Sequence, residues 1–121
     1  MSTILTIDDS ASIRQMVNMT LTAAGHQVVE AINGADGYAK ATAQTIHAVL
    51  TDLNMPEMNG IEFIRKYRQH PSSVGVPIIL LTTESDEALK LEARQAGATG
   101  WIVKPFKQDQ LVAVVKKVTG A

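Results

Sequence analysis

Short apolar runs alternate with longer amphipathic stretches along the whole chain. The apolar runs predict five β-strands, which cover residues 3–7, 28–32, 48–51, 76–81 and 100–103. The run at 76–81 is almost wholly apolar, which is typical of a strand covered on both faces. The stretches between and after these runs carry apolar residues at helical spacing and predict helices.

Capping residues mark the ends of the predicted helices. The sequence Asp8-Asp9-Ser10 supplies N-cap side chains for the first helix, which ends at Gly25. The second begins after Asn33-Gly34 and runs to about Gln44, and the fourth is capped by Ser85 or Asp86. The other two helices are predicted at 61–67 and after Pro105, where Leu111, Val114, Val115 and Val118 share one face.

Five repeats of strand then helix predict an open α/β sandwich, in which helices cover both faces of a parallel sheet. The second strand brings only Ile32 and Asn33 to its carboxyl end, so we expect it to be an edge strand without chemistry. This favours the strand order 2-1-3-4-5, with strands one and three side by side in the sheet. A length of 121 residues predicts a single domain over residues 1–121.

Composition excludes several classes of function. The net charge of −1 argues against a nucleic-acid binder and against attraction to an anionic membrane. The absence of cysteine rules out disulfides and thiolate chemistry. The chain has no run of roughly 18 apolar residues and no signal-peptide pattern, so we expect a soluble cytoplasmic protein.

Polar residues with chemical potential follow the predicted strands at their carboxyl ends, where open parallel sheets place their sites. The first strand brings Asp8 and Asp9, the third Asp52, the fourth Thr82 and the fifth Lys104. Three carboxylates in one pocket repel each other unless a cation compensates them. Because the set offers oxygen ligands and neither histidine nor cysteine, it indicates a hard ion, above all Mg²⁺.

The same residues are the parts that phosphoryl transfer requires. Lys104 can meet a phosphoryl group as a point charge, and the Thr82 hydroxyl can donate to it. Without a serine, histidine or cysteine nucleophile at this place, the acceptor must be a carboxylate, and Asp52 is the best candidate. Each residue taken alone also has a simpler role as helix cap, turn or strand residue. Their joint placement after four different strands favours the site.

Four motifs carry a family resemblance. They are Ile-Asp-Asp-Ser at 7–10, Thr-Asp-Leu-Asn-Met-Pro-Glu-Met-Asn-Gly at 51–60, Leu-Thr-Thr-Glu at 81–84 and Val-Lys-Pro-Phe at 103–106. In this order they resemble bacterial response-regulator receiver domains, most of all the stand-alone CheY type of chemotaxis. The resemblance covers the whole chain. It implies a flavodoxin-like (βα)5 fold, whose strand order is again 2-1-3-4-5, and a switch operated by phosphorylation.

The resemblance also implies a role for each site residue. Asp52 would be the phosphoacceptor, and Thr82 and Lys104 would contact the phosphoryl group. Mg²⁺ would be held directly by Asp9, Asp52 and the backbone carbonyl of Asn54, and through water by Asp8. The peptide between Lys104 and Pro105 would be cis, as it is in the family.

Signal output in the family implies a second set of residues. Trp101 stands where relatives usually place a smaller aromatic side chain, as the rotameric switch coupled to Thr82. Its simpler role is to cover the fifth strand. Asn54, Thr83 and Glu84 stand at the positions that tune the rate, and Thr83 is a candidate for narrowing access to Asp52. We expect a short-lived phosphoryl group. The output face would comprise Leu91, Trp101, Val112 and Lys116.

The resemblance implies partners as well. The donor would be a CheA-like sensor histidine kinase or a small acyl phosphate, and the usual target would be a flagellar motor switch protein, with an auxiliary phosphatase as a further partner. A phosphate sink or a regulator of a non-flagellar chemosensory output remains the alternative. We expect a monomeric phosphoacceptor, not an enzyme acting on external substrates. A flavin module, a metal-dependent phosphatase and a receiver working without phosphate fit the motifs less well. The three histidines are predicted at the surface or in loops.

Overall fold

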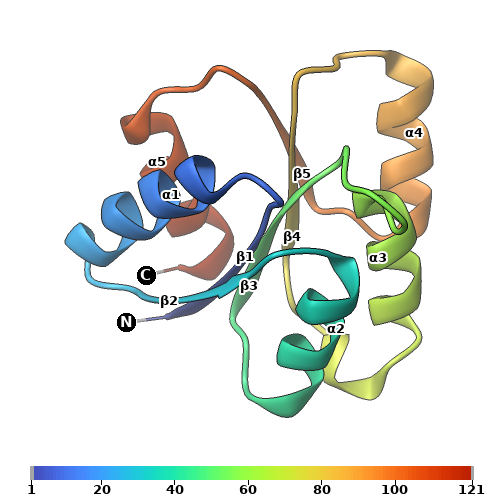
Figure 1. The fold of residues 1–121 in the computed structure, drawn as a ribbon, viewed down its shortest axis with the longest axis horizontal. Helices are drawn as coiled ribbons and strands as arrows, with labels where there is room; N and C mark the ends of the chain where they lie inside the picture. Colours follow the sequence, from blue (N-terminus) through green and yellow to red (C-terminus); the bar gives the residue numbers. More distant parts are fainter. Residues whose placement is uncertain (1, 121) are drawn as a thin grey trace.

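The computed structural model describes residues 2–120, in which strands and helices alternate from end to end (Figure 1). The strands are β1 (Thr3–Ile7), β2 (Gln27–Ala31), β3 (Ala48–Asp52), β4 (Ile78–Thr82) and β5 (Gly100–Val103). The helices are α1 (Ala11–Ala23), α2 (Gly34–Ala43), α3 (Gly60–Arg68), α4 (Glu87–Ala96) and α5 (Gln108–Thr119). A 3-10 turn, η1 (Pro71–Ser73), precedes β4.

The strands form one parallel sheet in the order β2-β1-β3-β4-β5, which confirms the predicted topology. Strand β1 pairs with β2 on one side and β3 on the other, with Ile7 opposite Ala31 and Thr51. Asp52 is the last residue of β3 and lies opposite Leu81 of β4. The residues that follow β1 and β3 therefore leave the sheet side by side.

Two apolar layers fill the space between the sheet and its helices. Side chains of β1 alternate between them: Leu5 and Ile7 face α2, α3 and α4, whereas Ile4 faces α1 and α5. Figure 1 shows the same division, with α1 and α5 on one side of the sheet and the other helices opposite. Burial of each large aliphatic side chain contributes about 1.5–3 kcal/mol to folding. No helix within residues 2–120 is long and apolar enough to cross a membrane.

The N-cap side chains of the helices include those predicted from the sequence. The Ser10 hydroxyl accepts a hydrogen bond from the Ile13 N–H, and the Asn33 side chain accepts one from the Asp36 N–H. Asp86 caps α4, which settles the choice between it and Ser85. Asn59 and Glu62 form a capping box at the start of α3.

One local prediction was wrong. Strand β4 begins at Ile78 instead of residue 76, because Pro77 has no N–H to donate to the sheet. His26 lies in the loop between α1 and β2, one of the two predicted places, and it is buried there, with 7% of its surface exposed. Gly25 has a left-handed φ of 96°, and the following His26 N–H donates to the Leu21 carbonyl. This bond folds His26 back against the end of α1.

Candidate functional site

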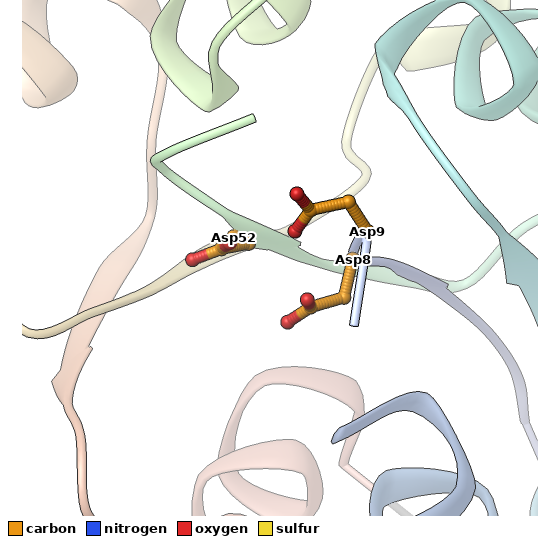
Figure 2. Close-up of side chains that lie close together, drawn as sticks. All are labelled: Asp8, Asp9 and Asp52. Atoms are coloured by element: carbon orange, nitrogen blue, oxygen red, sulfur yellow. The ribbon is translucent and has the colours of Figure 1, made fainter. Parts of the chain in front are cut away.

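Three carboxylates converge at the carboxyl edge of the sheet. Asp8 and Asp9 follow β1, and Asp52 ends the neighbouring β3, so the strand order alone brings them together. Each offers one oxygen, and these atoms lie within 4.8 Å of one another. Figure 2 shows the three side chains close together at this edge of the sheet. The predicted acidic cluster is therefore present.

The three carboxylates differ in burial and in bonding. Asp8 is only 1% exposed, and its two oxygens accept hydrogen bonds from the Ser10 N–H at 2.9 Å and from Lys104 Nζ at 3.3 Å. Asp52 is 7% exposed and accepts from Lys104 Nζ at 3.1 Å. Asp9 is exposed, and its carboxylate makes no hydrogen bond within the described part of the chain. Asp9 is thus the carboxylate most open to a ligand from solvent.

Burial raises the pKa of Asp52 above its usual value, and the neighbouring charge of Asp8 raises the pKa further. Lys104 opposes both effects through its charge and its hydrogen bond. The net direction is upward, with burial as the largest cause. The cluster also sets three carboxylates against Lys104, which leaves an excess of negative charge. The site favours an additional positive charge.

Lys104 follows the edge strand β5, which lies next to β4, and its side chain reaches the acidic cluster. Its own N–H donates to the Thr82 carbonyl at 2.7 Å, which joins the carboxyl ends of β4 and β5. The side chain is 17% exposed and its Nζ lies between Asp8 and Asp52. The peptide bond between Lys104 and Pro105 is cis. The structure thus brings Lys104 to the predicted place.

Thr82 and Trp101 are connected through the backbone of one residue, Glu84. The buried Thr82 hydroxyl oxygen accepts from the Glu84 N–H at 3.1 Å. The carbonyl of the same Glu84 accepts from the Trp101 indole Nε1 at 3.0 Å. The two residues predicted to act as a switch therefore share a backbone neighbour. The side chains of Thr83 and Glu84 are exposed beside them.

The loop after Asp52 is tightly packed against the start of α3. A Cβ on Gly60 would lie 2.5 Å from the Asp52 carbonyl oxygen and 2.7 Å from a Leu80 methyl group, so only glycine fits there. Within the loop, Glu57 has a φ of 69°, and the Met58 N–H donates to the Pro56 carbonyl at 2.8 Å. This bond closes a γ-turn around Glu57. The side chain of Asn54 is exposed in the same loop.

Sequence reasoning missed one cation near the cluster. Arg14 on α1 donates from its guanidinium to the Asp8 backbone carbonyl at 2.6 Å. It also pairs with Glu30 of β2 at 3.3 Å. The sequence carries no signal for this contact, because its acceptor is a backbone carbonyl, a group that every residue carries.

The residues of the predicted output face lie along α4, β5 and α5. The side chain of Leu91 is 52% exposed, Lys116 is exposed, and Trp101 and Val112 are half-buried. Beside Trp101 the surface is hollowed between α4 and β5, where the lining includes Lys90 and Arg94. The face thus combines apolar and basic side chains.

The donor set at the carboxyl edge fits a hard divalent cation. Its ligand atoms are carboxylate oxygens, and the carboxylate of Asp9 is exposed. The three carboxylates repel one another, and a bound cation would offset this repulsion. Mg²⁺ keeps several waters and needs few protein ligands, so this shallow arrangement suits it. Asp8 has both oxygens already engaged and is the least available for direct contact.

Comparison with known proteins gives one consistent result. Residues 4–116 match the family described as the response regulator receiver domain. A chemotaxis protein CheY homolog of Campylobacter jejuni is 38% identical, over 97% of this chain and 92% of its own. The structure of chemotaxis protein CheY4 of Vibrio cholerae superposes with a TM-score of 0.94 at 42% identity and covers 98% of both chains.

A third relative bears on the metal. The receiver domain of a sensor histidine kinase of Pseudomonas aeruginosa superposes with a TM-score of 0.90 at 26% identity, over 99% of this chain and 98% of its own. That structure is described with a magnesium ion coordinated in its active-site cleft.

Proposed function

The chain belongs to the response regulator receiver domain family, and we propose that it is a phosphorylation-dependent signalling switch of a chemotaxis two-component system. The observation that carries the proposal is the convergence of Asp8, Asp9 and Asp52 with Lys104 at the carboxyl edge of the sheet. The proposal treats residues 1–121 as one receiver domain.

Asp52 is the phosphoacceptor in this proposal. A carboxylate oxygen of Asp52 attacks the phosphorus of the donor, and the donor's N–P or O–P bond breaks with its electron pair leaving on the donor. Lys104, 3.1 Å from Asp52, neutralises charge on the phosphoryl oxygens. The Thr82 hydroxyl keeps its proton free to donate, because its oxygen is the acceptor in the contact with Glu84.

The residues that would hold Mg²⁺ are Asp9, Asp52 and the Asn54 backbone carbonyl, with Asp8 acting through water. The hydrogen bonds to both carboxylate oxygens of Asp8 support its indirect role, and the exposed carboxylate of Asp9 supports direct contact. The cation supplies positive charge that offsets carboxylate repulsion and the charge of the incoming phosphoryl group. Lys104 then exchanges its contact with a carboxylate for one with phosphoryl oxygens.

The signal leaves the site through Thr82, Glu84 and Trp101. Phosphorylation adds about −1.5 to −2 charges and three acceptor oxygens at Asp52. When the Thr82 hydroxyl turns to donate to one of them, its contact with the Glu84 N–H is lost. The backbone of Glu84 is then free to move, and the Trp101 indole that its carbonyl holds moves with it. This couples the site to the face formed by Leu91, Trp101, Val112 and Lys116.

The upstream partner is a CheA-like histidine kinase, and a small acyl phosphate serves as an alternative donor. The output partner that fits the family is a flagellar motor switch protein, with a phosphate sink or a non-flagellar output as the alternative. The protein is a signalling protein. We propose that its only chemistry is its own phosphorylation and dephosphorylation, tuned by Asn54, Thr83 and Glu84 and assisted by an auxiliary phosphatase. The proposal places it in the cytoplasm as a monomer.

Intact-mass measurement tests the proposed function. The protein is incubated with Mg²⁺ and acetyl phosphate, beside an Asp52→Asn variant and a metal-free sample. We expect one added phosphoryl group in the wild type and none in either control. Asp109→Asn is a control, since Asp109 is an exposed aspartate in the first turn of α5 and lies outside the cluster. An adduct that persists in Asp52→Asn would overturn the proposed acceptor.

A further inference from the structure

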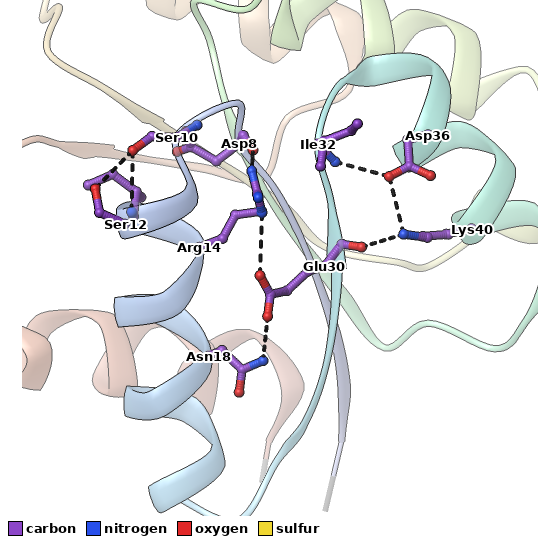
Figure 3. A network of polar contacts seen from close by, with 10 residues as sticks. Asp8, Ser10, Ser12, Arg14, Asn18, Glu30, Ile32, Asp36 and Lys40 are labelled. Atoms are coloured by element: carbon purple, nitrogen blue, oxygen red, sulfur yellow. Dashed lines mark hydrogen bonds and ion pairs between the residues drawn. The ribbon is translucent and has the colours of Figure 1, made fainter.

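The backbone of Asp8 is held by a polar network that the phosphoryl chemistry does not use. Arg14 donates to the Asp8 carbonyl at 2.6 Å and pairs through Nε with Glu30 at 3.3 Å. The second carboxylate oxygen of Glu30 accepts from the Asn18 amide at 2.7 Å. Figure 3 shows this path from the end of β1 through α1 to β2. The Glu30 carboxylate is thus fixed by a further contact.

The network continues to α2 on the other side of β2. Lys40 donates to the backbone carbonyl of Glu30 at 2.6 Å and to Asp36 at 3.1 Å. Asp36 also accepts from the Ile32 N–H at 3.0 Å (Figure 3). These bonds and the charge of Lys40 lower the pKa of Asp36 below its usual value, although burial acts in the opposite direction. Glu30 is therefore held from its backbone as well as from its side chain.

This network fixes the backbone between Asp8 and Asp9. The carbonyl of Asp8 and the N–H of Asp9 belong to one peptide unit, so the bond from Arg14 sets the orientation of the backbone that carries Asp9. The Asp9 carboxylate itself has no hydrogen-bond partner within residues 2–120. Its direction therefore depends on its backbone, which Arg14 holds at the Asp8 carbonyl and the Asp8 carboxylate holds at the Ser10 N–H.

Glu30 also determines where the Arg14 charge points. A guanidinium that contacted the carboxylates of Asp8 or Asp9 would compete with a divalent cation for them. The structure instead directs one edge of the guanidinium to a backbone oxygen and another to Glu30. Arg14 is only 15% exposed at its side chain, so this arrangement is packed in place. Lys104, by contrast, contacts the carboxylates themselves.

We propose that Arg14 and Glu30 form a positioning pair that presets the Asp8–Asp9 turn for a divalent cation. The proposal rests on the proposed function, because it assigns the acidic cluster to Mg²⁺. Residues one shell beyond metal ligands commonly orient the ligands, and their loss weakens metal affinity by about 10- to 100-fold. Arg14 and Glu30 touch neither phosphoryl group nor cation in this scheme and act through the backbone of Asp8.

Calorimetric titration with MgCl₂, without any phosphoryl donor, tests this pair. Arg14→Met keeps the length and packing of the side chain and removes the guanidinium, and we expect it to raise the Kd for Mg²⁺ by about 10-fold. Arg14→Lys keeps one donor for the Asp8 carbonyl and is expected to restore part of the affinity. Arg65→Met is the matched control, because Arg65 pairs with Glu92 at 2.9 Å between α3 and α4. It should leave the Kd unchanged.

A comparison of single and double variants separates a positioning role of Arg14 from a merely structural one. If Arg14 acts by orienting Asp9, its removal costs affinity in the wild type but little in an Asp9→Asn background. A purely structural role would lower the free energy of unfolding and leave the Kd of the folded protein unchanged. An unchanged Kd in a folded Arg14→Met variant would overturn the pair. If this variant does not fold, Glu30→Gln provides the same test, with an expected rise of about threefold in Kd.

The two proposals fail in different ways. Wild-type protein that binds no Mg²⁺ and accepts no phosphoryl group would contradict the proposed function itself. Wild-type protein that binds Mg²⁺ with the same Kd as Arg14→Met and Glu30→Gln would contradict the positioning pair alone.

Discussion

The two ends of the sheet each hold a half-buried cation, and the partners of the two cations differ. At the carboxyl end, Lys104 contacts the carboxylates of Asp8 and Asp52. At the amino end, the Arg68 guanidinium donates to the backbone carbonyls that precede β4 and β5, those of Ser73, Val76 and Gly97. Burial lowers the pKa of Arg68 from its usual value.

The difference in partners separates structure from chemistry. Carbonyls are neutral acceptors that stay in place, so Arg68 ties the loops before two strands together permanently. Burial and then repulsion between the carboxylates around Lys104 raise the pKa of Asp52, so their arrangement changes when a cation or a phosphoryl group arrives. Arg68 has backbone carbonyls as partners and stabilises the fold. Lys104 is shared between two carboxylates, and these carboxylates can exchange their partners.

Removal of the Lys104 charge should have the largest effect. We expect Lys104→Met to slow phosphorylation by acetyl phosphate about 100-fold, because a preorganised cation next to developing charge contributes on that scale. The rate is measured by intact mass at saturating Mg²⁺. Arg68→Met should retain the wild-type rate while it remains folded. Equal rates for Lys104→Met and wild type would contradict the assignment of Lys104.

Removal of the Arg68 charge should act on stability instead. Three carbonyls lose a charged donor in Arg68→Met, and we expect the free energy of unfolding to fall by about 3 kcal/mol. Urea unfolding followed by circular dichroism measures it. The half-exposed pair of Arg65 and Glu92 supplies the contrast, with an expected loss of about 0.5 kcal/mol for Arg65→Met. Similar losses for the two variants would show that the backbone contacts of Arg68 contribute little.

Two glycines differ in how closely their neighbours approach, and Gly60 packs against the backbone of Asp52. Gly60→Ala should lower the free energy of unfolding by about 2 kcal/mol, because its Cβ meets the backbone of Asp52. Gly100→Ala, whose Cβ would meet only the flexible end of Ile79, is expected to cost clearly less. Chemical unfolding of both variants measures the two values. A neutral Gly60→Ala would show that the Asp52 loop can move aside.

The stability of wild type and Asp52→Asn, measured over a series of pH values, tests the electrostatics of Asp52. The pKa of Asp52 is raised in the folded state, so its contribution to stability is present below the ordinary value of 3.8 and is lost as pH rises through the raised pKa. Without metal, Asp52→Asn should therefore gain stability relative to wild type as pH increases. Added Mg²⁺ should reduce this gain. A difference that stays constant from acid to neutral pH would contradict the raised pKa.

The sequence predicted the sheet order and the acidic cluster because both follow from local patterns. Strand ends are marked by apolar runs that stop at Asp8 and Asp52, and parallel topology brings those ends to one edge. The contacts of Arg14 and Arg68 could not be predicted. Their main acceptors are backbone carbonyls, which every residue carries and no sequence pattern marks. The burial of His26 and the left-handed Glu57 likewise depend on how neighbouring segments pack.

Localisation of the phosphoryl group tests the central claim most directly. Borohydride reduces an acyl phosphate to an alcohol, so a phosphorylated aspartate is recovered as homoserine in a peptide map. After treatment with Mg²⁺ and acetyl phosphate, we expect homoserine at position 52 and aspartate at positions 8 and 9. Homoserine at 8 or 9, or an adduct that leaves aspartate at 52, would contradict the account.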